Sequence, residues 1–225
     1  MIPDCSRSEE NYLKAIYSLS IRKEKVITND ISEKLSTKPA SVSNMLKKLA
    51  EKEFISYEKY HGVYLTEMGK KIAIIVMRKH RLWETFLMEK LGFAWDKVHL
   101  IAEQLEHIKS EELVERLDDF LENPKFDPHG APIPDKFGNI AIASYKALAE
   151  VEHGSWVTIK RVKGGEPSFL KYLDRTGIQL ETKVFVEERF EFDQSIMLKF
   201  ESGTTLQVSE QVAKNLMVEI GNGNK

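Results

Sequence analysis

The residues of this chain that are best suited to bind a ligand lie in one short stretch, where histidine and glutamate recur at helical spacing. They are His80, Glu84, His99, Glu103, Glu106 and His107. Gly92 separates the first two from the rest, so two consecutive helices would each present imidazole and carboxylate groups on one side. Imidazole nitrogen combined with carboxylate oxygen suits manganese, iron, cobalt, nickel or zinc better than calcium. The stretch therefore predicts a site for a divalent transition metal.

The second of these predicted helices has two distinct faces. At about 100° per residue, its histidine and glutamate side chains fall within an arc of about 100°. The apolar side chains occupy an arc of about 80° on the opposite side, which predicts a packing stripe. They are Val98, Ile101, Leu105 and Ile108. A polar face that is merely solvated is the simpler interpretation for one helix. Two His-x-x-x-Glu pairs on consecutive helices favour metal binding, because histidine is an uncommon choice for a solvated surface.

Other metal motifs fit the chain less well. Zinc proteases use His-Glu-x-x-His or His-x-x-Glu-His, and Glu103 stands where the first histidine of the second pattern would be. Di-iron bundles use Glu-x-x-His, but Gln104 stands three residues before His107. The single cysteine, Cys5, excludes a zinc knuckle built on Cys-x-x-Cys.

The composition describes an ordinary globular protein. Of 225 residues, 42% are hydrophobic and 30% are charged, and no apolar run has the length of a membrane span. The first residues combine neither a basic start nor an apolar core, so no signal peptide is expected. A single cysteine cannot form an intrachain disulfide, which agrees with a reducing compartment. We therefore expect a cytoplasmic protein without a membrane partner.

Charge is distributed unevenly along the chain, although the net charge is −2. Residues 38–71 contain seven Lys and four Glu, a balance of +3, whereas residues 100–152 contain twelve acidic and five basic residues, a balance of −7. The locally basic segment could dock on phosphate, although most charge runs simply solvate a surface.

Hydrophobic periodicity predicts a winged helix-turn-helix in the first part of the chain. Apolar residues at helical spacing indicate three helices, at 8–21, 28–35 and 39–52. Alternating apolar residues at 54–66 indicate a β-hairpin that turns near His61-Gly62.

The remainder of the chain divides into a helical part and a β part. Further helices are expected at 66–91, around His99, at 111–122 and at 139–151. Residues 123–138 contain four prolines and two glycines, so this stretch is expected to be irregular. After residue 154 the pattern changes to period two, which predicts a small barrel of five or six strands, interrupted by one helix at Pro167–Arg175.

The third predicted helix is the candidate DNA-reading element, because the second helix of a helix-turn-helix pair enters the major groove with its N-terminal part. Its candidate contacts are Lys38, Pro39, Ala40, Ser41, Ser43, Asn44, Lys47 and Lys48. Small residues let the backbone approach DNA, Asn44 can pair with adenine, and lysines face phosphate. Few of these side chains make bidentate contacts to guanine, so DNA shape and thymine methyl groups would contribute to specificity. The alternative is a three-helix packing module with no DNA partner.

Several segments resemble the diphtheria-toxin-repressor-like metal-dependent regulators, and in particular the branch of manganese transport regulators. They are Asn11–Tyr17, Val76–Leu82, Lys97–His99, Glu106–His107 and Asp127–Pro134. The combination of His80 with the Gly-x-Pro-Ile-Pro run makes the resemblance specific. It implies a fold that is mainly α with small β parts. The implied parts are a winged helix-turn-helix at 1–72, a helical metal-binding and dimerisation domain at 73–145, a linker at 146–154 and a C-terminal SH3-like (FeoA-like) β-barrel at 155–225.

The resemblance also implies two metal sites per subunit. The residues that match the first site are His80, Glu84 and His99, with Glu166 near the position of a further ligand from the C-terminal domain. Those that match the second site are Glu103, Glu106 and His107, with Asn11 at the position of a ligand from the first helix.

Three residues depart from the family pattern, and they bear on the metal. Iron-responsive members carry Cys where this chain has Glu103, and a carboxylate is a harder ligand than a thiolate, so Glu103 favours manganese. Asn11 stands where relatives carry Met or Asp, and Lys14 stands where some manganese regulators carry a carboxylate.

The expected function is metal-dependent repression of transcription at metal-ion homeostasis genes, by a homodimer that binds double-stranded operator DNA and responds to Mn²⁺. An Fe²⁺-dependent repressor is the alternative within the family, and Zn²⁺ or Co²⁺ would substitute in vitro. The rival from another class is a metalloenzyme that uses Glu84 or Glu103 as a base. No nucleophile motif supports it, so we expect neither enzyme activity nor a small-molecule substrate. A third interpretation is a DNA-binding adaptor that needs no metal.

Overall fold

The computed structural model describes residues 4–21, 23–58, 62–141 and 144–221. The chain forms two compact units, and helix α4 (Glu67–Glu89) contributes residues to both. The first unit comprises Met1–His80, Glu103–Arg116 and Pro134–Ile140, and the second comprises Arg81–Ala102, Leu117–Ile133 and Ala141–Lys225. The three-part division expected from the sequence, with its boundaries, stays a prediction.

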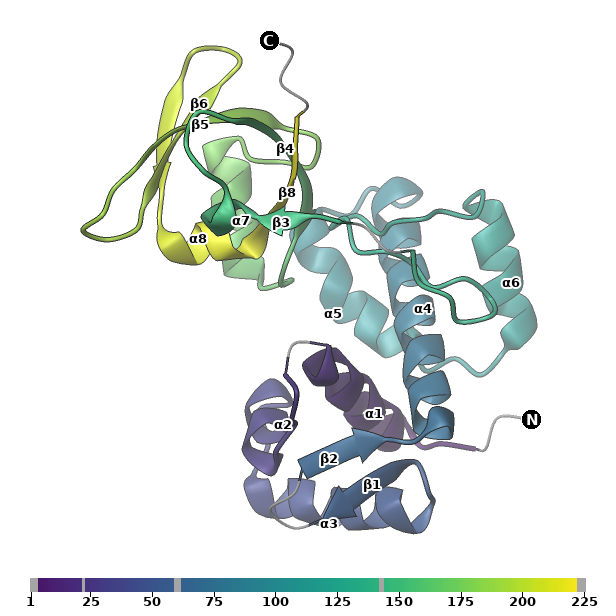
Figure 1. The fold of residues 1–225 in the computed structure, drawn as a ribbon. Helices are drawn as coiled ribbons and strands as arrows, with labels where there is room; N and C mark the ends of the chain where they lie inside the picture. The colour runs from purple at the N-terminus through teal and green to yellow at the C-terminus, as the bar shows by residue number, and fades with distance from the viewer. Residues whose placement is uncertain (1–3, 22, 59–61, 142–143, 222–225) are drawn as a thin grey trace. The chain divides into compact units, whose positions relative to one another are not determined.

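The N-terminal part of the first unit consists of three helices followed by a β-hairpin (Figure 1). The elements are α1 (Arg7–Ser20), α2 (Thr28–Lys34), α3 (Pro39–Glu51), β1 (Ile55–Glu58) and β2 (Gly62–Leu65). Helix α1 begins with a capping box, in which Ser6 Oγ accepts from the backbone N–H of Glu9 and the Glu9 carboxylate accepts from that of Ser6. The predicted winged helix-turn-helix is confirmed, and His61 of the predicted turn lies outside the described residues.

A hydrophobic core joins these helices to the hairpin. Helix α3 contributes Val42, Leu46 and Leu49, which have no exposed surface (0%). Their spacing of three and four residues places them on one face, so the opposite face of α3 points outward. Cys5 is also buried in this core, which makes it a packing residue and not a surface thiol.

Helix α4 is followed by α5 (Trp95–Leu105) and α6 (Glu111–Phe120). The predicted helix around His99 exists but is shorter than expected, because it ends at Leu105. Glu106 and His107 therefore lie in the turn that follows and not on the polar face of the helix. The carboxylate of Glu106 is bound by side chains from two other helices, and these tertiary contacts prevail over the helical pattern of the sequence.

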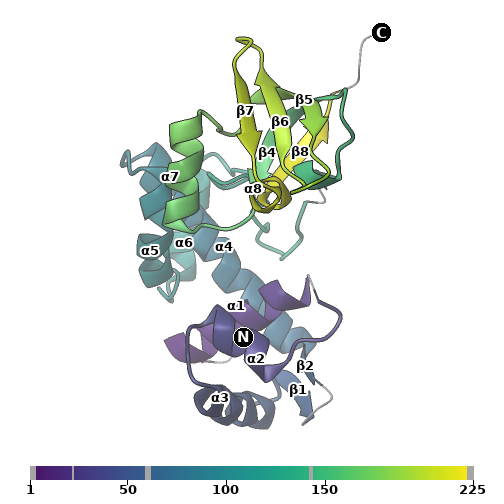
Figure 2. The same cartoon turned by 90° about the vertical axis from the view of Figure 1, so that its left-hand side faces the viewer.

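The second unit contains a six-stranded antiparallel sheet in the order β3-β8-β4-β5-β6-β7. Figure 2 labels its strands β4 to β8. Its strands are β3 (Lys146–Ala147), β4 (Trp156–Val162), β5 (Lys183–Arg189), β6 (Ile196–Phe200), β7 (Thr205–Val208) and β8 (Leu216–Ile220). Between them lie a 3₁₀ helix, η1 (Leu148–Glu150), and helices α7 (Pro167–Thr176) and α8 (Glu210–Asn215). The small β domain and its predicted helix α7 are confirmed, whereas α8 was not predicted. Strands β3 and β7 do not pair with each other within the described residues.

The predicted continuous helix at 139–151 is wrong, because the described residues of that range form no α-helix and only Leu148–Glu150 form a short 3₁₀ helix. The side chain of Asp135 accepts hydrogen bonds from the backbone N–H groups of Phe137 and Asn139, which forms a tight turn. Further along, Lys146 and Ala147 pair with β8 as an edge strand. A continuous helix would break the pairing of Lys146 and Ala147 with β8, so the sheet prevails over the local apolar spacing.

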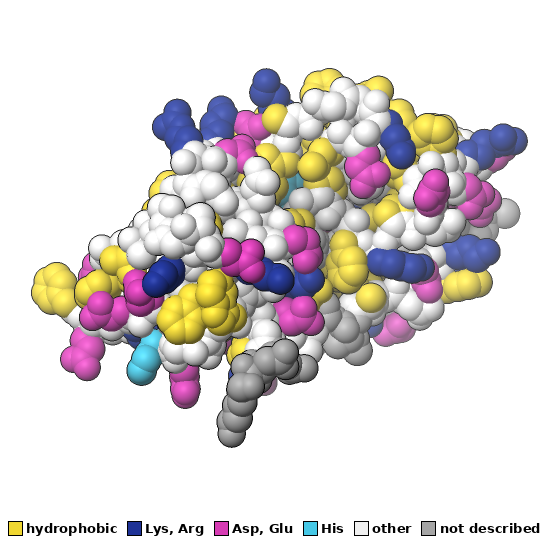
Figure 3. All heavy atoms as spheres, turned by 90° about the horizontal axis from the view of Figure 1, so that it is seen from above, with side chains coloured by type: hydrophobic (Ala, Val, Ile, Leu, Met, Phe, Trp, Pro, Cys, Tyr) yellow, Lys and Arg dark blue, Asp and Glu magenta, His cyan; other side chains and the backbone are white. Residues whose placement is uncertain are grey.

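Exposed charges of both signs are mixed on the face drawn in Figure 3, with hydrophobic side chains between them. That face presents no field of a single sign. Among the described helices, none is both long enough and apolar enough to cross a membrane.

Candidate metal centre and nucleic-acid interface

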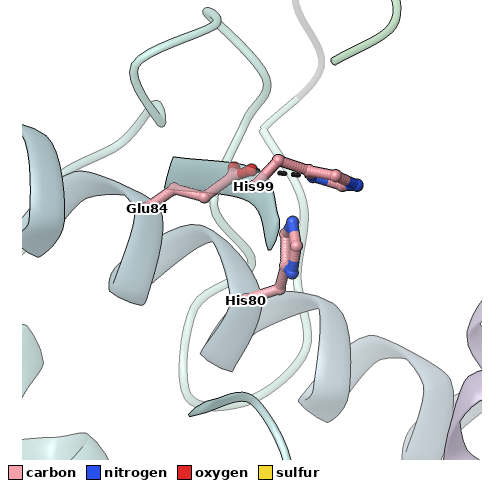
Figure 4. A group of neighbouring side chains, drawn as sticks. All are labelled: His80, Glu84 and His99. Carbon is pink, nitrogen blue, oxygen red and sulfur yellow. Dashed lines mark hydrogen bonds and ion pairs between the residues drawn. The ribbon is translucent and has the colours of Figure 1, made fainter. Parts of the chain in front are cut away.

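His80, Glu84 and His99 come together as the sequence predicted (Figure 4). His80 and Glu84 lie one turn apart on α4, and His99 lies on α5. One ligand atom from each residue lies within 4.8 Å of the others. His99 Nδ1 is 3.1 Å from Glu84 Oε1, and Glu84 is buried while the side chain of His99 is 37% exposed. The carboxylate is therefore shielded from water, while one of its histidine partners remains accessible.

Asp127 and His129 also lie beside Glu84, although the sequence patterns did not identify them as candidate ligands. Asp127 and His129 form a buried group with Glu84 in which one ligand atom from each lies within 4.8 Å of the others. His129 Nδ1 is 3.7 Å from Glu84 Oε2, the carboxylate oxygen that does not face His99. Both residues lie in the Pro- and Gly-rich stretch after α6. Their Asp-x-His spacing is the sequence feature that could have identified them as candidate ligands. We call His80, Glu84, His99, Asp127 and His129 the Glu84 group.

The backbone fixes the orientation of the two additional residues. His129 Nε2 lies 3.1 Å from the backbone oxygen of Trp95, so Nε2 carries the hydrogen and the lone pair of a neutral ring is on Nδ1, toward Glu84. Asp127 Oδ1 accepts from the backbone N–H groups of His129 and Ala131, at 2.8 and 2.9 Å. The imidazole and the carboxylate are thus held in place before any ligand arrives.

Burial and charge shift the ionisation of this group. Burial alone would lower the pKa of His129, but the adjacent carboxylate of Glu84 outweighs it, and the pKa is raised. Burial raises the pKa of Asp127, and the negative charge of Glu84 adds to that effect. Two carboxylates and imidazole in a buried cluster of this kind favour a bound cation.

The other sequence-predicted ligands meet partners on α1 and α4. Glu106 is fully buried, and its two oxygens lie 2.6 and 2.7 Å from Lys14 Nζ. Glu106 Oε2 is also 2.5 Å from His80 Nδ1, and His107 Nδ1 is 2.5 Å from Glu10 Oε2. Burial would raise the pKa of Glu106, but His80 and Lys14 outweigh it and lower the pKa. We call Glu10, Lys14, Glu106 and His107 the Glu106 group.

Glu10 was missed in the sequence. It lies one turn before Lys14 on α1, and a helical wheel would have placed both on one face of α1. Asn11, the expected first-helix ligand, is half-buried on the same helix. Glu103 lies on α5, where its backbone oxygen is 3.5 Å from Arg7 Nη2. Glu166 is exposed at the start of α7 and joins neither of the metal-ligand groups found among the described residues.

The two groups offer different surroundings to a metal ion. The Glu84 group offers oxygen and nitrogen donors of the kinds that manganese and iron accept. The Glu106 group is different, because an ammonium group already contacts both oxygens of its buried carboxylate. An ammonium group has no lone pair to donate, and it repels a metal cation placed beside it.

The candidate DNA-contacting residues lie on the outward face of α3 and at its start. Lys38, Pro39, Ala40, Ser41, Asn44 and Lys47 are exposed there, and Ser43 is half-buried. Ser43 Oγ donates to the backbone oxygen of Pro39. Lys48 differs from Lys47, because its Nζ lies 3.2 Å from Glu9 Oε1, so part of its charge is used within the first unit.

Comparison with known families matches three successive parts of the chain. Residues 4–63 match the N-terminal DNA binding domain of iron dependent repressors. Residues 66–135 match the metal binding and dimerisation domain of iron dependent repressors, and residues 146–220 match the FeoA domain.

Individual repressors are also similar to this chain. The chain is 36% identical over 125 residues to the iron-dependent repressor IdeR of Mycobacterium tuberculosis (strain ATCC 25618 / H37Rv), which is 56% of this chain and 54% of that protein. The chain thus spans about half the length of that relative. It is 32% identical over 163 residues to IdeR of Mycobacterium leprae (strain TN), covering 69% of this chain and 71% of that protein. A solved structure of a manganese-dependent transcriptional repressor in complex with manganese is 32% identical, with a TM-score of 0.89, and covers 95% of this chain and 100% of that one.

Proposed function

Because this chain belongs to the family of iron-dependent repressors, we propose that it represses metal-ion homeostasis genes in response to a divalent metal. It binds double-stranded operator DNA as a homodimer when the Glu84 group holds a metal ion. The observation that carries the proposal is this group itself, in which buried carboxylates and oriented imidazoles converge in a chain that also exposes a DNA-reading helix. The match to a DNA binding domain and to a metal binding and dimerisation domain supports the same function.

The residues of the Glu84 group prepare the site in distinct ways. The Trp95 carbonyl aims the Nδ1 lone pair of His129 toward Glu84. The Glu106 carboxylate accepts from Nδ1–H of His80, which places the lone pair of the neutral His80 ring on Nε2. A bound divalent ion would supply the positive charge that the two buried carboxylates require. Such an ion would activate DNA binding only to the extent that it bound the DNA-competent state more tightly than the other state.

Manganese is the proposed physiological ion, with iron as the alternative. Oxygen donors from Glu84 and Asp127 together with imidazole suit both ions, and the chain offers no thiolate among its candidate ligands. Zinc and cobalt should bind in vitro, since raw affinity follows the Irving–Williams order whatever the biological metal is. Both metals also occur among the similar proteins. The solved structure is of a manganese-dependent repressor, and the mycobacterial proteins are iron-dependent repressors.

Binding to DNA under defined metal conditions tests this proposal. An operator is first selected from a random duplex library with the purified chain in Mn²⁺. Its affinity is then measured without oxygen, with chelator and with Mn²⁺, Fe²⁺, Zn²⁺ or Co²⁺. We expect tight binding with Mn²⁺ and its loss with chelator. Equal affinity in chelator and in every metal would instead support the metal-independent adaptor.

A further inference from the structure

Lys14 places a fixed positive charge in the second set of residues that the sequence assigned to a metal. Its Nζ lies 2.6 Å from Glu106 Oε1 and 2.7 Å from Oε2, so the ammonium group spans both oxygens of the carboxylate. Glu106 is 0% exposed and the side chain of Lys14 is 21% exposed. A contact of this geometry, largely shielded from water, is a strong charge-assisted hydrogen bond.

His107 lies beside the same carboxylate. Its Nδ1 is 2.5 Å from Glu10 Oε2, so the hydrogen of the neutral ring is on Nδ1 and the lone pair is on Nε2. This buried Nε2 makes no hydrogen bond to any residue that the structure describes, and it lies 3.5 Å from Glu106 Oε1. In the neutral ring this lone pair faces Glu106 Oε1, the oxygen that Lys14 approaches at 2.6 Å. An aligned imidazole and carboxylate are the donors of a metal site, but the positive charge beside them belongs to Lys14.

We propose that Lys14 is a built-in cation that takes the place of a metal ion at Glu106 and His107, so that each chain binds one metal ion, in the Glu84 group. This inference rests on the proposed function only in assuming that the Glu84 group binds metal. A divalent ion could reach Glu106 only if Lys14 moved away, because the two cations would repel each other at the same oxygens. The ammonium also links α1 to the turn after α5 without any metal, within the first unit.

The number of bound ions per chain tests the proposal. The full chain is stripped with chelator, and bound Mn²⁺ is then counted by equilibrium dialysis with elemental analysis. We expect one ion for the natural chain and two for Lys14→Met, which removes the charge and leaves Glu106 and His107 to bind metal. Lys14→Arg, which keeps the charge, should bind one. Lys214→Glu changes the charge of an exposed lysine on α8 and should also bind one.

A second substitution identifies which site is filled. Glu84→Gln should reduce the count to zero in the natural chain and to one in the Lys14→Met background. Circular dichroism confirms that each variant is folded. Two ions in the natural chain, or an unchanged count in folded Lys14→Met, would overturn the inference about Lys14. If the natural chain binds no ion, the proposed function fails. In that case, one ion in Lys14→Met would still support the role of Lys14, and no ion would overturn it.

Discussion

At the residue scale, the contacts of each side chain decide what the candidate site can bind. The sequence identified His80, Glu84 and His99 because their spacing is helical and their types are those of metal ligands. It could not identify every partner of the candidate ligands, since His129 approaches Glu84 and Glu10 approaches His107 from segments distant in the sequence. Hydrogen bonding across such distances depends on the tertiary fold, and local periodicity carries no information about it.

Glu84 should control the ionisation of His129. In the metal-free protein, the Glu84 carboxylate raises the pKa of His129 against the opposing effect of burial. Glu84→Gln removes that charge, so the pKa of His129 should fall and the ring should lose its proton at lower pH than in the natural chain. Proton NMR titration of the histidine Cε1–H signals, in the presence of chelator, measures the change. Glu210→Gln on α8 serves as control, and an unchanged His129 titration in Glu84→Gln would contradict the assigned contact.

Glu9 should contribute stability that depends on pH. Burial alone would raise its pKa, but hydrogen bonds from Lys52, Ser6 and Lys48 lower it from 4.5 to about 2. A pKa that is lowered by folding stabilises the folded state above pH 4.5, and this stabilisation is lost as the pH falls toward 2. Glu9→Gln should therefore lower the free energy of unfolding by up to about 3 kcal/mol at neutral pH, and by progressively less in acid.

Urea unfolding at pH 7 and at pH 3, with chelator present, checks the Glu9 prediction. Glu112→Gln is the matched control, because Glu112 forms an exposed ion pair with Arg116 on α6. Such exposed pairs contribute little to stability. Equal losses for the two variants, or a Glu9→Gln loss that does not shrink in acid, would show that the buried contacts of Glu9 do not stabilise the fold.

At the scale of elements, the helices and strands with strong periodicity were predicted well. The buried stripe of α3 and the alternation in β4 and β6 were clear in the sequence. The errors arose where tertiary contacts prevail over local pattern: α5 ends at Leu105, and residues 146–147 form an edge strand. The pairing of Lys146 with β8 joins segments about 70 residues apart, so no local window could reveal it.

Helix α3 provides a test of the DNA-reading surface. Asn44→Ala should weaken binding to the selected operator by about 1–3 kcal/mol if Asn44 pairs with a base, with little effect on random DNA. Lys47→Ala should weaken binding to all sequences and flatten the salt dependence. Lys48→Ala should have a smaller effect on DNA binding, because Lys48 is already paired with Glu9. Fluorescence anisotropy at several salt concentrations measures the DNA affinity of each variant. If Asn44→Ala lost affinity equally for the operator and for random DNA, base reading by Asn44 would be excluded.

At the scale of the whole molecule, the proposal is that metal binding and DNA reading are coupled within a homodimer. Two copies of α3 would reach successive faces of the major groove, which requires a particular dimer geometry.

The metal that activates the homodimer is a separate question. Glu103 lies outside the Glu84 group, so a thiolate in its place would not contact the ion that this group holds. Glu103→Cys should therefore leave unchanged the order in which manganese, iron, cobalt and zinc activate operator binding, measured by metal titration. Activation of the natural chain by iron but not by manganese would instead support the iron-dependent alternative.

The most direct test of the whole account is the affinity for the selected operator as a function of free Mn²⁺, compared between the natural chain and Glu84→Gln. The account predicts that Mn²⁺ strengthens binding by the natural chain in a saturable manner, and that chelator reverses this effect. Glu84→Gln should stay at the low affinity of the metal-free protein at all Mn²⁺ concentrations that saturate the natural chain, while remaining folded. Operator affinity that rises with Mn²⁺ equally in both proteins would contradict the assignment of the Glu84 group as the regulatory metal site.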